Sequence, residues 1–133
     1  MKLIFLYFPS VFLFAYFING NQLEGTKWNL YSIQSDKENF RYILYKVTST
    51  IEFGDSIYSG NAGCNGFGGY CKIEKEMILF RDLATTTMLC DGNGMIVENF
   101  VHKNLRKLFY KINSDTLVLS DRNGVVLKYT KKK

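Results

Sequence analysis

The feature that most constrains this chain is a glycine-rich stretch from Gly60 to Gly69, in which glycine recurs at intervals of three residues or fewer. Glycine enters positive-φ backbone without a Cβ clash, whereas inside a helix each glycine costs about 1 kcal/mol relative to alanine. The stretch is therefore expected to form turns and bulges between strands. A phosphate-binding loop would need a following helix and a Gly-Lys-Ser/Thr sequence, which does not occur in this chain.

The segments around this stretch carry a strand-like pattern. The chain contains eleven Phe and nine Tyr, and aromatic residues favour pleated sheet surfaces. Turn chemistry at 54–56 and at Asn123-Gly124 marks hairpins. Strands are predicted over residues 28–33, 40–47, 50–53, 57–59, 67–73, 77–80, 110–112, 116–120 and 125–130.

Near residues 95–109 the spacing of the apolar residues changes to that of a helix. Apolar residues there follow three- and four-residue spacing: Ile96, Val97, Phe100, Val101, Leu105 and Leu108. The polar side is predicted to hold Glu98, His102, Lys103, Arg106 and Lys107. The fold class is therefore α+β, with a curved antiparallel sheet of about seven or eight strands, partly closed and barrel-like, and one helix packed against it.

Residues 1–20 are expected to lie outside this domain. Lys2 precedes an apolar run from Leu3 to Ile18, which is shorter than the roughly 20 residues that a spanning helix needs. The segment is predicted to be a secretory signal peptide cut after Gly20, with an uncleaved anchor as the alternative. The domain would then comprise residues 21–133.

A set of motifs in this order and spacing resembles the META/HslJ domain family. Leu23, Gly25, Thr26 and Trp28 resemble its opening strand, and Glu98, Val101 and Leu105 resemble its helix. The central signature consists of Gly63, Cys64, Asn65, Phe67, Gly69, Tyr70, Thr86, Met88 and Cys90. The resemblance implies a small α+β domain without established catalytic residues, in a family associated with stress tolerance and virulence.

Three cysteines in an exported chain imply one disulfide and one leftover thiol. The family motif favours a bond between Cys64 and Cys90, which leaves Cys71 as a small buried apolar residue. A Cys64–Cys71 bond and three reduced cysteines are the alternatives. A disulfide that closes a loop of about 25 residues stabilises a fold by about 3 kcal/mol.

Few groups in the chain could support catalysis. The single histidine, His102, is expected on the surface, and a Cys90–His102 dyad has no supporting pattern. Cys64, Cys71 and one distant histidine do not form a zinc-ligand cluster. We therefore expect no enzyme activity, cofactor or metal, with thiol-dependent activity at Cys71 or Cys90 as an alternative.

The formal charge of +5 raises the question of an anionic partner. A positive face could form from Lys103, Arg106, Lys107, Lys111, Lys128 and the C-terminal lysines. Export argues against nucleic acid, and membrane contact is expected only through an uncleaved signal or weak electrostatic attraction. The sequence therefore predicts a monomeric protein, secreted or in the cell envelope, whose partner is an unidentified protein or small ligand. One alternative function is a module that binds a small ligand or a protein at the open end of its sheet, as lipocalin-like barrels do.

Overall fold

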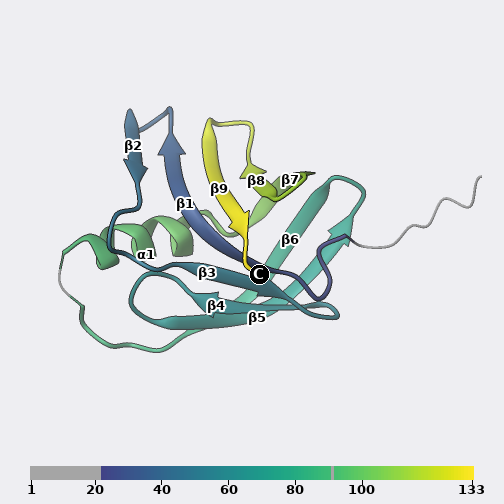
Figure 1. Ribbon diagram of the computed structural model, residues 1–133, viewed down its shortest axis with the longest axis horizontal. Helices are drawn as coiled ribbons and strands as arrows, with labels where there is room; N and C mark the ends of the chain where they lie inside the picture. Colours follow the sequence, from purple (N-terminus) through teal and green to yellow (C-terminus); the bar gives the residue numbers. More distant parts are fainter. Residues whose placement is uncertain (1–21, 91) are drawn as a thin grey trace, which may run out of the picture.

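The computed structural model describes residues 22–90 and 92–133, so the predicted signal peptide at residues 1–20 lies outside the described part. Nine strands and one helix follow one another along the chain (Figure 1). They are β1 (Lys27–Ser35), β2 (Phe40–Ile43), β3 (Thr50–Phe53), β4 (Ile57–Asn61), β5 (Gly66–Glu74), β6 (Met77–Thr85), α1 (Asn93–Asn104), β7 (Lys107–Asn113), β8 (Thr116–Ser120) and β9 (Val125–Lys131).

Eight of these strands close into an antiparallel barrel. The sheet order is β2-β1-β3-β4-β5-β6-β7-β8-β9, and an additional pairing between β1 and β9 closes the ring. β2 lies outside the ring as an extra strand on β1. The prediction of a curved antiparallel sheet with one helix is confirmed, with nine strands in the sheet.

β1 pairs with three strands because it is long enough for two of them, β2 and β3, to share one of its edges. Lys27–Asn29 pair with β3, and Ser32–Ser35 pair with β2 on the same edge. The opposite edge pairs with β9 from Trp28 to Ser35, with a register shift between Leu30 and Ser32. β1 therefore joins the two ends of the described chain.

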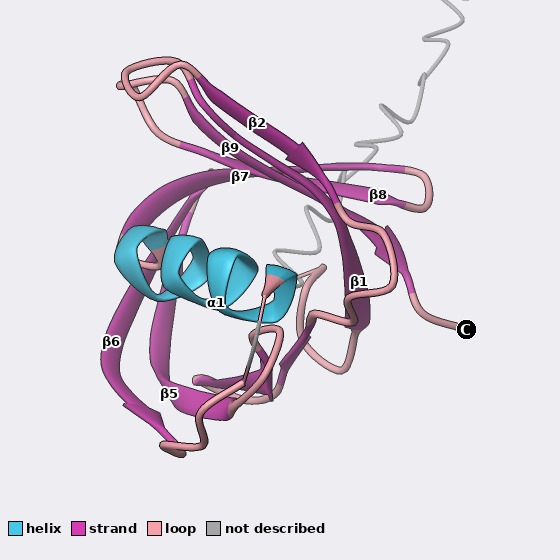
Figure 2. Ribbon diagram, turned by 90° about the vertical axis from the view of Figure 1, so that its left-hand side faces the viewer, coloured by secondary structure: helices cyan, strands magenta, loops and turns pink. Residues whose placement is uncertain are grey.

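The helix α1 lies across one end of the barrel, enclosed by the strands (Figure 2). Its buried residues are Val97, Glu98, Phe100 and Val101, which face the sheet. The Phe100 ring lies 5.9 Å from that of Phe40 in β2, so the helix also contacts the extra strand.

The predicted end of the helix at residue 109 is wrong. The helix ends at Asn104, and Leu105 leaves helical backbone with a ψ of 83°. Lys107–Phe109 instead begin β7, where Leu108 is buried opposite Ile78 of β6. The spacing that placed Leu108 on the helix also fits an inward-facing strand position, and pairing with β6 decides between the two.

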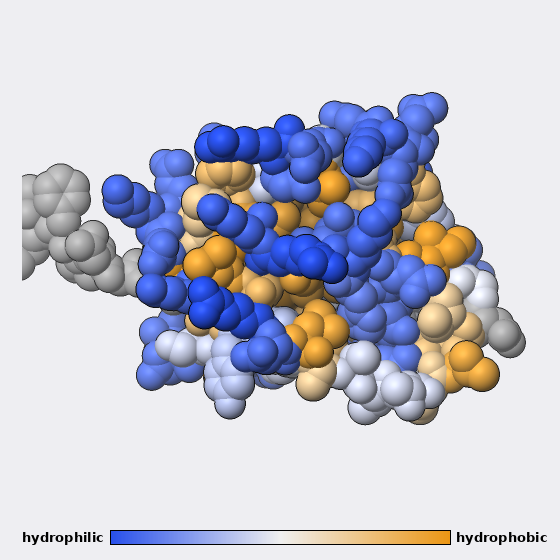
Figure 3. Space-filling model, turned by 180° about the vertical axis from the view of Figure 1, so that it is seen from behind, coloured by the Kyte–Doolittle hydropathy of each residue, from blue (hydrophilic) through white to orange (hydrophobic). Residues whose placement is uncertain are grey.

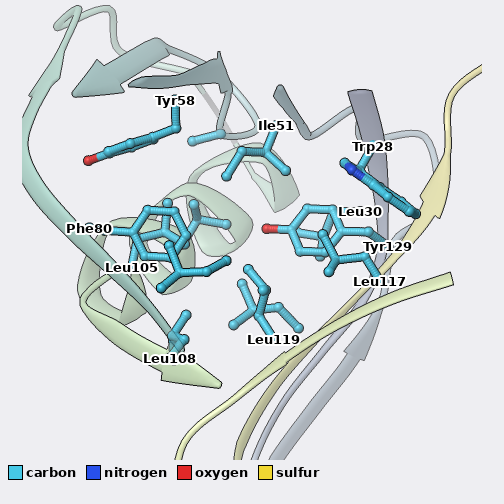
Figure 4. Packing of buried hydrophobic residues seen from close by; sticks show 14 of the residues in the cluster. Trp28, Leu30, Ile51, Tyr58, Phe80, Leu105, Leu108, Leu117, Leu119 and Tyr129 are labelled. Carbon is cyan, nitrogen blue, oxygen red and sulfur yellow. The ribbon is translucent and has the colours of Figure 1, made fainter. Parts of the chain in front are cut away.

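The barrel interior is filled by side chains. Trp28, Leu119 and Tyr129 are among the largest fully buried residues, and the Tyr129 ring points into the middle of the cluster (Figure 4). Tyr58 contacts Phe80 edge-on at 5.0 Å between ring centroids. The interior of this eight-stranded barrel is therefore a core of packed side chains.

The predicted strand over residues 40–47 is too long. β2 ends at Ile43, after which the Leu44 amide still donates to the Tyr31 carbonyl oxygen at 3.0 Å. Residues 44–49 then carry the chain to β3. The aromatic content of this segment is typical of a strand, but only Phe40–Ile43 pair with β1.

Candidate functional site

The candidate site is the corner where the connection β4–β5 meets the start of α1. Gly63 has a φ of 130°, and its backbone lies directly against Gly94 in the first turn of the helix. A Cβ on Gly63 would lie 2.6 Å from the Gly94 carbonyl oxygen, and a Cβ on Gly94 would lie 2.8 Å from that of Gly63. Both positions therefore require glycine, because any side chain would separate the helix from the corner.

Asn65 lies at the centre of a buried hydrogen-bond network in this corner. Its side chain pairs with the Met88 backbone: the Met88 amide donates to Oδ1 at 2.6 Å, and Nδ2 donates to the Met88 carbonyl oxygen at 3.0 Å. The Thr86 hydroxyl also donates to Oδ1, at 2.9 Å. The Asn65 amide group thus makes the two hydrogen bonds to Met88 that a neighbouring strand would otherwise make. Met88 lies in the connection between β6 and α1, outside any strand.

Glu98 of α1 completes this network. One carboxylate oxygen accepts from the Asn65 backbone amide at 2.6 Å, and the other accepts from Asn65 Nδ2 at 2.9 Å. Glu98 is 3% exposed, so both oxygens depend on these bonds in place of water. The prediction that Glu98 lies on the polar side of the helix is therefore wrong.

A disulfide between Cys64 and Cys90 links the two segments of the same corner covalently. The two Cα atoms are 5.9 Å apart, within the usual range for a disulfide. Cys64 immediately precedes Asn65, and Cys90 lies two residues after Met88. The covalent bond and the Asn65 hydrogen bonds therefore hold the same two chain segments together.

The corner gathers Gly63, Cys64, Asn65, Thr86, Met88 and Cys90, but Gly69 and Tyr70 of the signature lie elsewhere. Gly69 sits at a register shift between β5 and β6, where a Cβ would lie 2.4 Å from the Arg81 carbonyl oxygen. Tyr70, the next residue, is exposed on the outer face of β5. Gly69 therefore permits a bulge in the barrel wall and has no contact with the corner network.

The remaining candidate residues are also placed by the structure. Cys71 is free and buried in β5, and burial raises the pKa of its thiol above the ordinary value. His102 lies beside the Phe67 ring, with 6.1 Å between ring centroids, and its Nε2 atom is buried without a hydrogen-bond partner. The prediction that His102 lies on the surface is therefore wrong for its Nε2 atom, which is buried. Cys90 is held in the disulfide, so it cannot form the dyad with His102.

Sequence reasoning missed the burial of Glu98 and the role of Gly94. Glu98, Val101 and Leu105 share one helical face by their three- and four-residue spacing, so the motif itself contained the signal for Glu98. Gly94 stands in the first turn of a helix, where glycine has no local advantage. That placement indicates a close backbone contact, although the partner could not be known from sequence.

Residues 22–90 and 92–133 contain no group of three or more His, Cys, Asp or Glu side chains that could hold a metal ion. In the same residues no helix combines the length and apolar character needed to span a membrane.

Comparisons with known proteins agree with this architecture. An NMR structure of a protein from Burkholderia xenovorans is similar, with a TM-score of 0.71 and 20% identity, over 84% of each chain. A second NMR structure has a TM-score of 0.63 and 23% identity, over 82% of this chain and 91% of the other. No curated protein matched the sequence. The family model of the META domain matches residues 21–133, so the chain belongs to the META domain family.

Proposed function

We propose that this protein is an exported META domain that works by binding, not by catalysis, in the cell envelope or the extracellular space. The observation that supports this proposal is that several signature residues are engaged in structural bonds. The disulfide and the buried Asn65–Glu98 network commit Cys64, Asn65, Thr86 and Cys90 to holding the corner together. Side chains engaged in this way stabilise a scaffold for a binding surface.

Export is supported by two independent features. Disulfides form and persist in oxidising compartments, and the Cys64–Cys90 bond lies within the family signature. The apolar run from Leu3 to Ile18 has the length and flanks of a signal peptide. An exported location agrees with the envelope, stress or virulence role that resemblance to the family suggests.

The environment of the free cysteine, Cys71, supports a binding role over thiol chemistry. Cys71 is buried, and its raised pKa favours the thiol over the nucleophilic thiolate. A thiol-dependent activity at this residue would need the opposite environment. The outer surface is the better candidate for recognition: Figure 3 shows a face on which long hydrophilic side chains lie over apolar patches. The domain is expected to act as a monomer.

Export is tested by expressing the full chain and a Leu13→Arg variant, whose charge interrupts the apolar run, in the same bacterial host. We expect the full chain to appear outside the cytoplasm, cut near Gly20, with Cys64 and Cys90 joined in nonreducing mass spectrometry. The Leu13→Arg variant should stay in the cytoplasm. Cytoplasmic retention of the full chain with all three cysteines reduced would contradict export.

The absence of thiol chemistry is tested separately on the purified domain. Alkylation of Cys71 by iodoacetamide should be slow in the native protein and fast in denaturant, because folding shields the thiol and raises its pKa. Rapid modification of the native protein at neutral pH would favour the thiol-dependent alternative.

A further inference from the structure

A groove crosses the outer surface where the β5–β6 hairpin, β7 and the β8–β9 connection meet. Two adjoining hollows form it, of about 820 Å³ and about 250 Å³. The first is lined by Glu74, Lys75, Glu76, Met77 and Phe109, and the second by Met77, Lys107, Phe109, Asp121 and Arg122. Because Met77 and Phe109 belong to both and are direct partners across β6 and β7, they form a shared apolar floor. We call this feature the Met77–Phe109 groove.

Unpaired cations surround this floor. The Arg122 guanidinium lies over the Phe109 ring, 5.6 Å from its centroid, and Lys107 lines the same hollow. Lys75 borders the other hollow. None of these three side chains takes part in the ion pairs found among residues 22–90 and 92–133. A guanidinium that lies over a ring face still has N–H groups that can donate to an anion.

The acidic side chains around the groove are mostly engaged by the protein itself. Glu74 forms an ion pair with Lys72 at 2.9 Å, which lowers the pKa of its carboxyl group. Asp121 Oδ1 accepts from the backbone amides of Asn123 at 2.8 Å and Val125 at 2.9 Å. These two bonds fix the turn that presents Arg122. The cationic end of the groove is thus preorganised, whereas the Glu76 carboxylate remains at the far end.

We propose that the Met77–Phe109 groove binds a small, flat, apolar molecule that carries one anionic group, such as an aromatic carboxylate or sulfonate. The apolar body lies on Met77 and Phe109, and the anionic group accepts hydrogen bonds from Arg122 and Lys107. The size of the larger hollow falls within the range of small-molecule sites, and its lining combines apolar floor with a few converging polar groups.

The test uses two fluorescent probes that share an aromatic body, with the purified domain of residues 21–133. Anilinonaphthalene sulfonate carries one negative charge, and N-phenylnaphthylamine carries none. We expect the anionic probe to bind more tightly than the neutral probe. Arg122→Gln should weaken the anionic probe about tenfold or more, since hydrogen bonds to charged groups are among the stronger polar contacts. The same variant should leave binding of the neutral probe nearly unchanged.

The matched control is Arg41→Gln, which makes the same chemical change at an exposed residue of β2. Partner residues across the sheet place Arg41 opposite Gln34 and then Val126, Ser120 and Phe109, which is four strands away. At about 4.8 Å per strand the path along the curved sheet is about 19 Å, and Arg41 lines neither hollow, so Arg41→Gln should not alter binding. Nuclear magnetic resonance should show probe-induced amide shifts near Met77, Phe109 and Arg122.

Three outcomes would overturn the proposal: equal affinity for the two probes, equal weakening by Arg122→Gln and Arg41→Gln, or amide shifts centred away from the groove. Denaturation curves of both variants establish that a loss of binding is not a loss of folding. The result is independent of export, because the purified domain is used in solution, whereas export is read from the location and processing of the full chain.

Discussion

Asn65 shows how much of this fold can depend on one side chain. Its amide group makes bonds to Thr86, Met88 and Glu98, which belong to two different segments of the chain. Asn supplies a donor and an acceptor in fixed positions, and the Met88 backbone needs both. No other residue of the same size offers this combination, so the position is chemically specific.

Asn65→Asp should destabilise the domain by about 2 kcal/mol or more, because it replaces a donor with an oxygen that faces two acceptors in a buried site. The measurement is urea denaturation followed by circular dichroism. Asn113→Asp, the same change at an exposed residue of β7, should stay within about 0.5 kcal/mol of the wild type. Equal stability of the two variants would mean that the network contributes nothing to folding.

Alkaline pH should destabilise the domain through its buried tyrosines. Burial, together with the nearby Cys71 and Asp82, raises the pKa of Tyr58 from 10.0 to about 12. Burial also raises the pKa of Tyr129. In each case folding favours the neutral phenol. The stabilisation that Tyr58 contributes is therefore fully present below pH 10 and is lost as the pH rises towards 12.

This loss is measured as the free energy of unfolding at a series of pH values above neutrality. Tyr58→Phe should show a shallower decline than the wild type, although its starting stability is lower because the hydroxyl no longer donates to the Arg81 carbonyl oxygen. Tyr70→Phe removes a hydroxyl from an exposed residue and should leave the slope unchanged. A flat profile in the wild type would contradict the assignment.

At the scale of elements, the connection from β6 to α1 is the segment that most needs support. Residues 86–92 form no regular secondary structure where they are described, and Leu89 is 97% exposed. The Cys64–Cys90 disulfide and the Asn65 hydrogen bonds hold this segment to the barrel, together with a bond from the Thr86 amide to the Gly66 carbonyl oxygen at 3.1 Å. The helix N-terminus lacks a side-chain cap, so its position also depends on this attachment.

Removal of the disulfide by Cys64→Ser/Cys90→Ser should cost about 3 kcal/mol, since the bond closes a loop whose entropy is restricted in the unfolded chain. Hydrogen exchange should show the change locally, as loss of protection at the Met88 amide. Cys71→Ala keeps the disulfide and should retain that protection, although it removes a buried side chain. Unchanged stability and exchange in the double variant would refute this role of the bond.

At the scale of the whole molecule, pairing between β1 and β9 makes the barrel one cooperative unit. Seven residue pairs join the two strands, from Trp28 with Lys131 to Ser35 with Val125. Leu127 and Tyr129 project from β9 into the common core. Damage near the C-terminus should therefore reach strands that lie far away along the chain.

Leu127→Ala should destabilise the domain by about 2–5 kcal/mol, the usual cost of truncating a fully buried leucine. Exchange rates should rise together in β1, β5 and β9 if the barrel opens as a unit. Val126→Ala, at the neighbouring half-buried position on the outer face, should cost much less. A rise confined to β9 in Leu127→Ala would show that the barrel does not unfold cooperatively.

Local structure in this protein could be predicted from neighbouring residues along the chain. Glycine spacing between Gly60 and Gly69 excluded helix, the turn residues at Asn123-Gly124 marked a hairpin, and the change of period near Val97 marked the helix. Each of these features depends on backbone preferences and on side chains within a few residues. Such interactions are encoded over short distances and can be read along the chain.

Contacts between distant segments could not be predicted in this way and became known from the folded structure. The end of α1 before Lys107, the burial of Glu98 against Asn65 and the closure of β1 on β9 all depend on partners far away in the sequence. The Met77–Phe109 groove likewise combines residues from three parts of the barrel wall. The physical reason is that burial and hydrogen bonding depend on proximity in space, which is set when the sheet curves and closes.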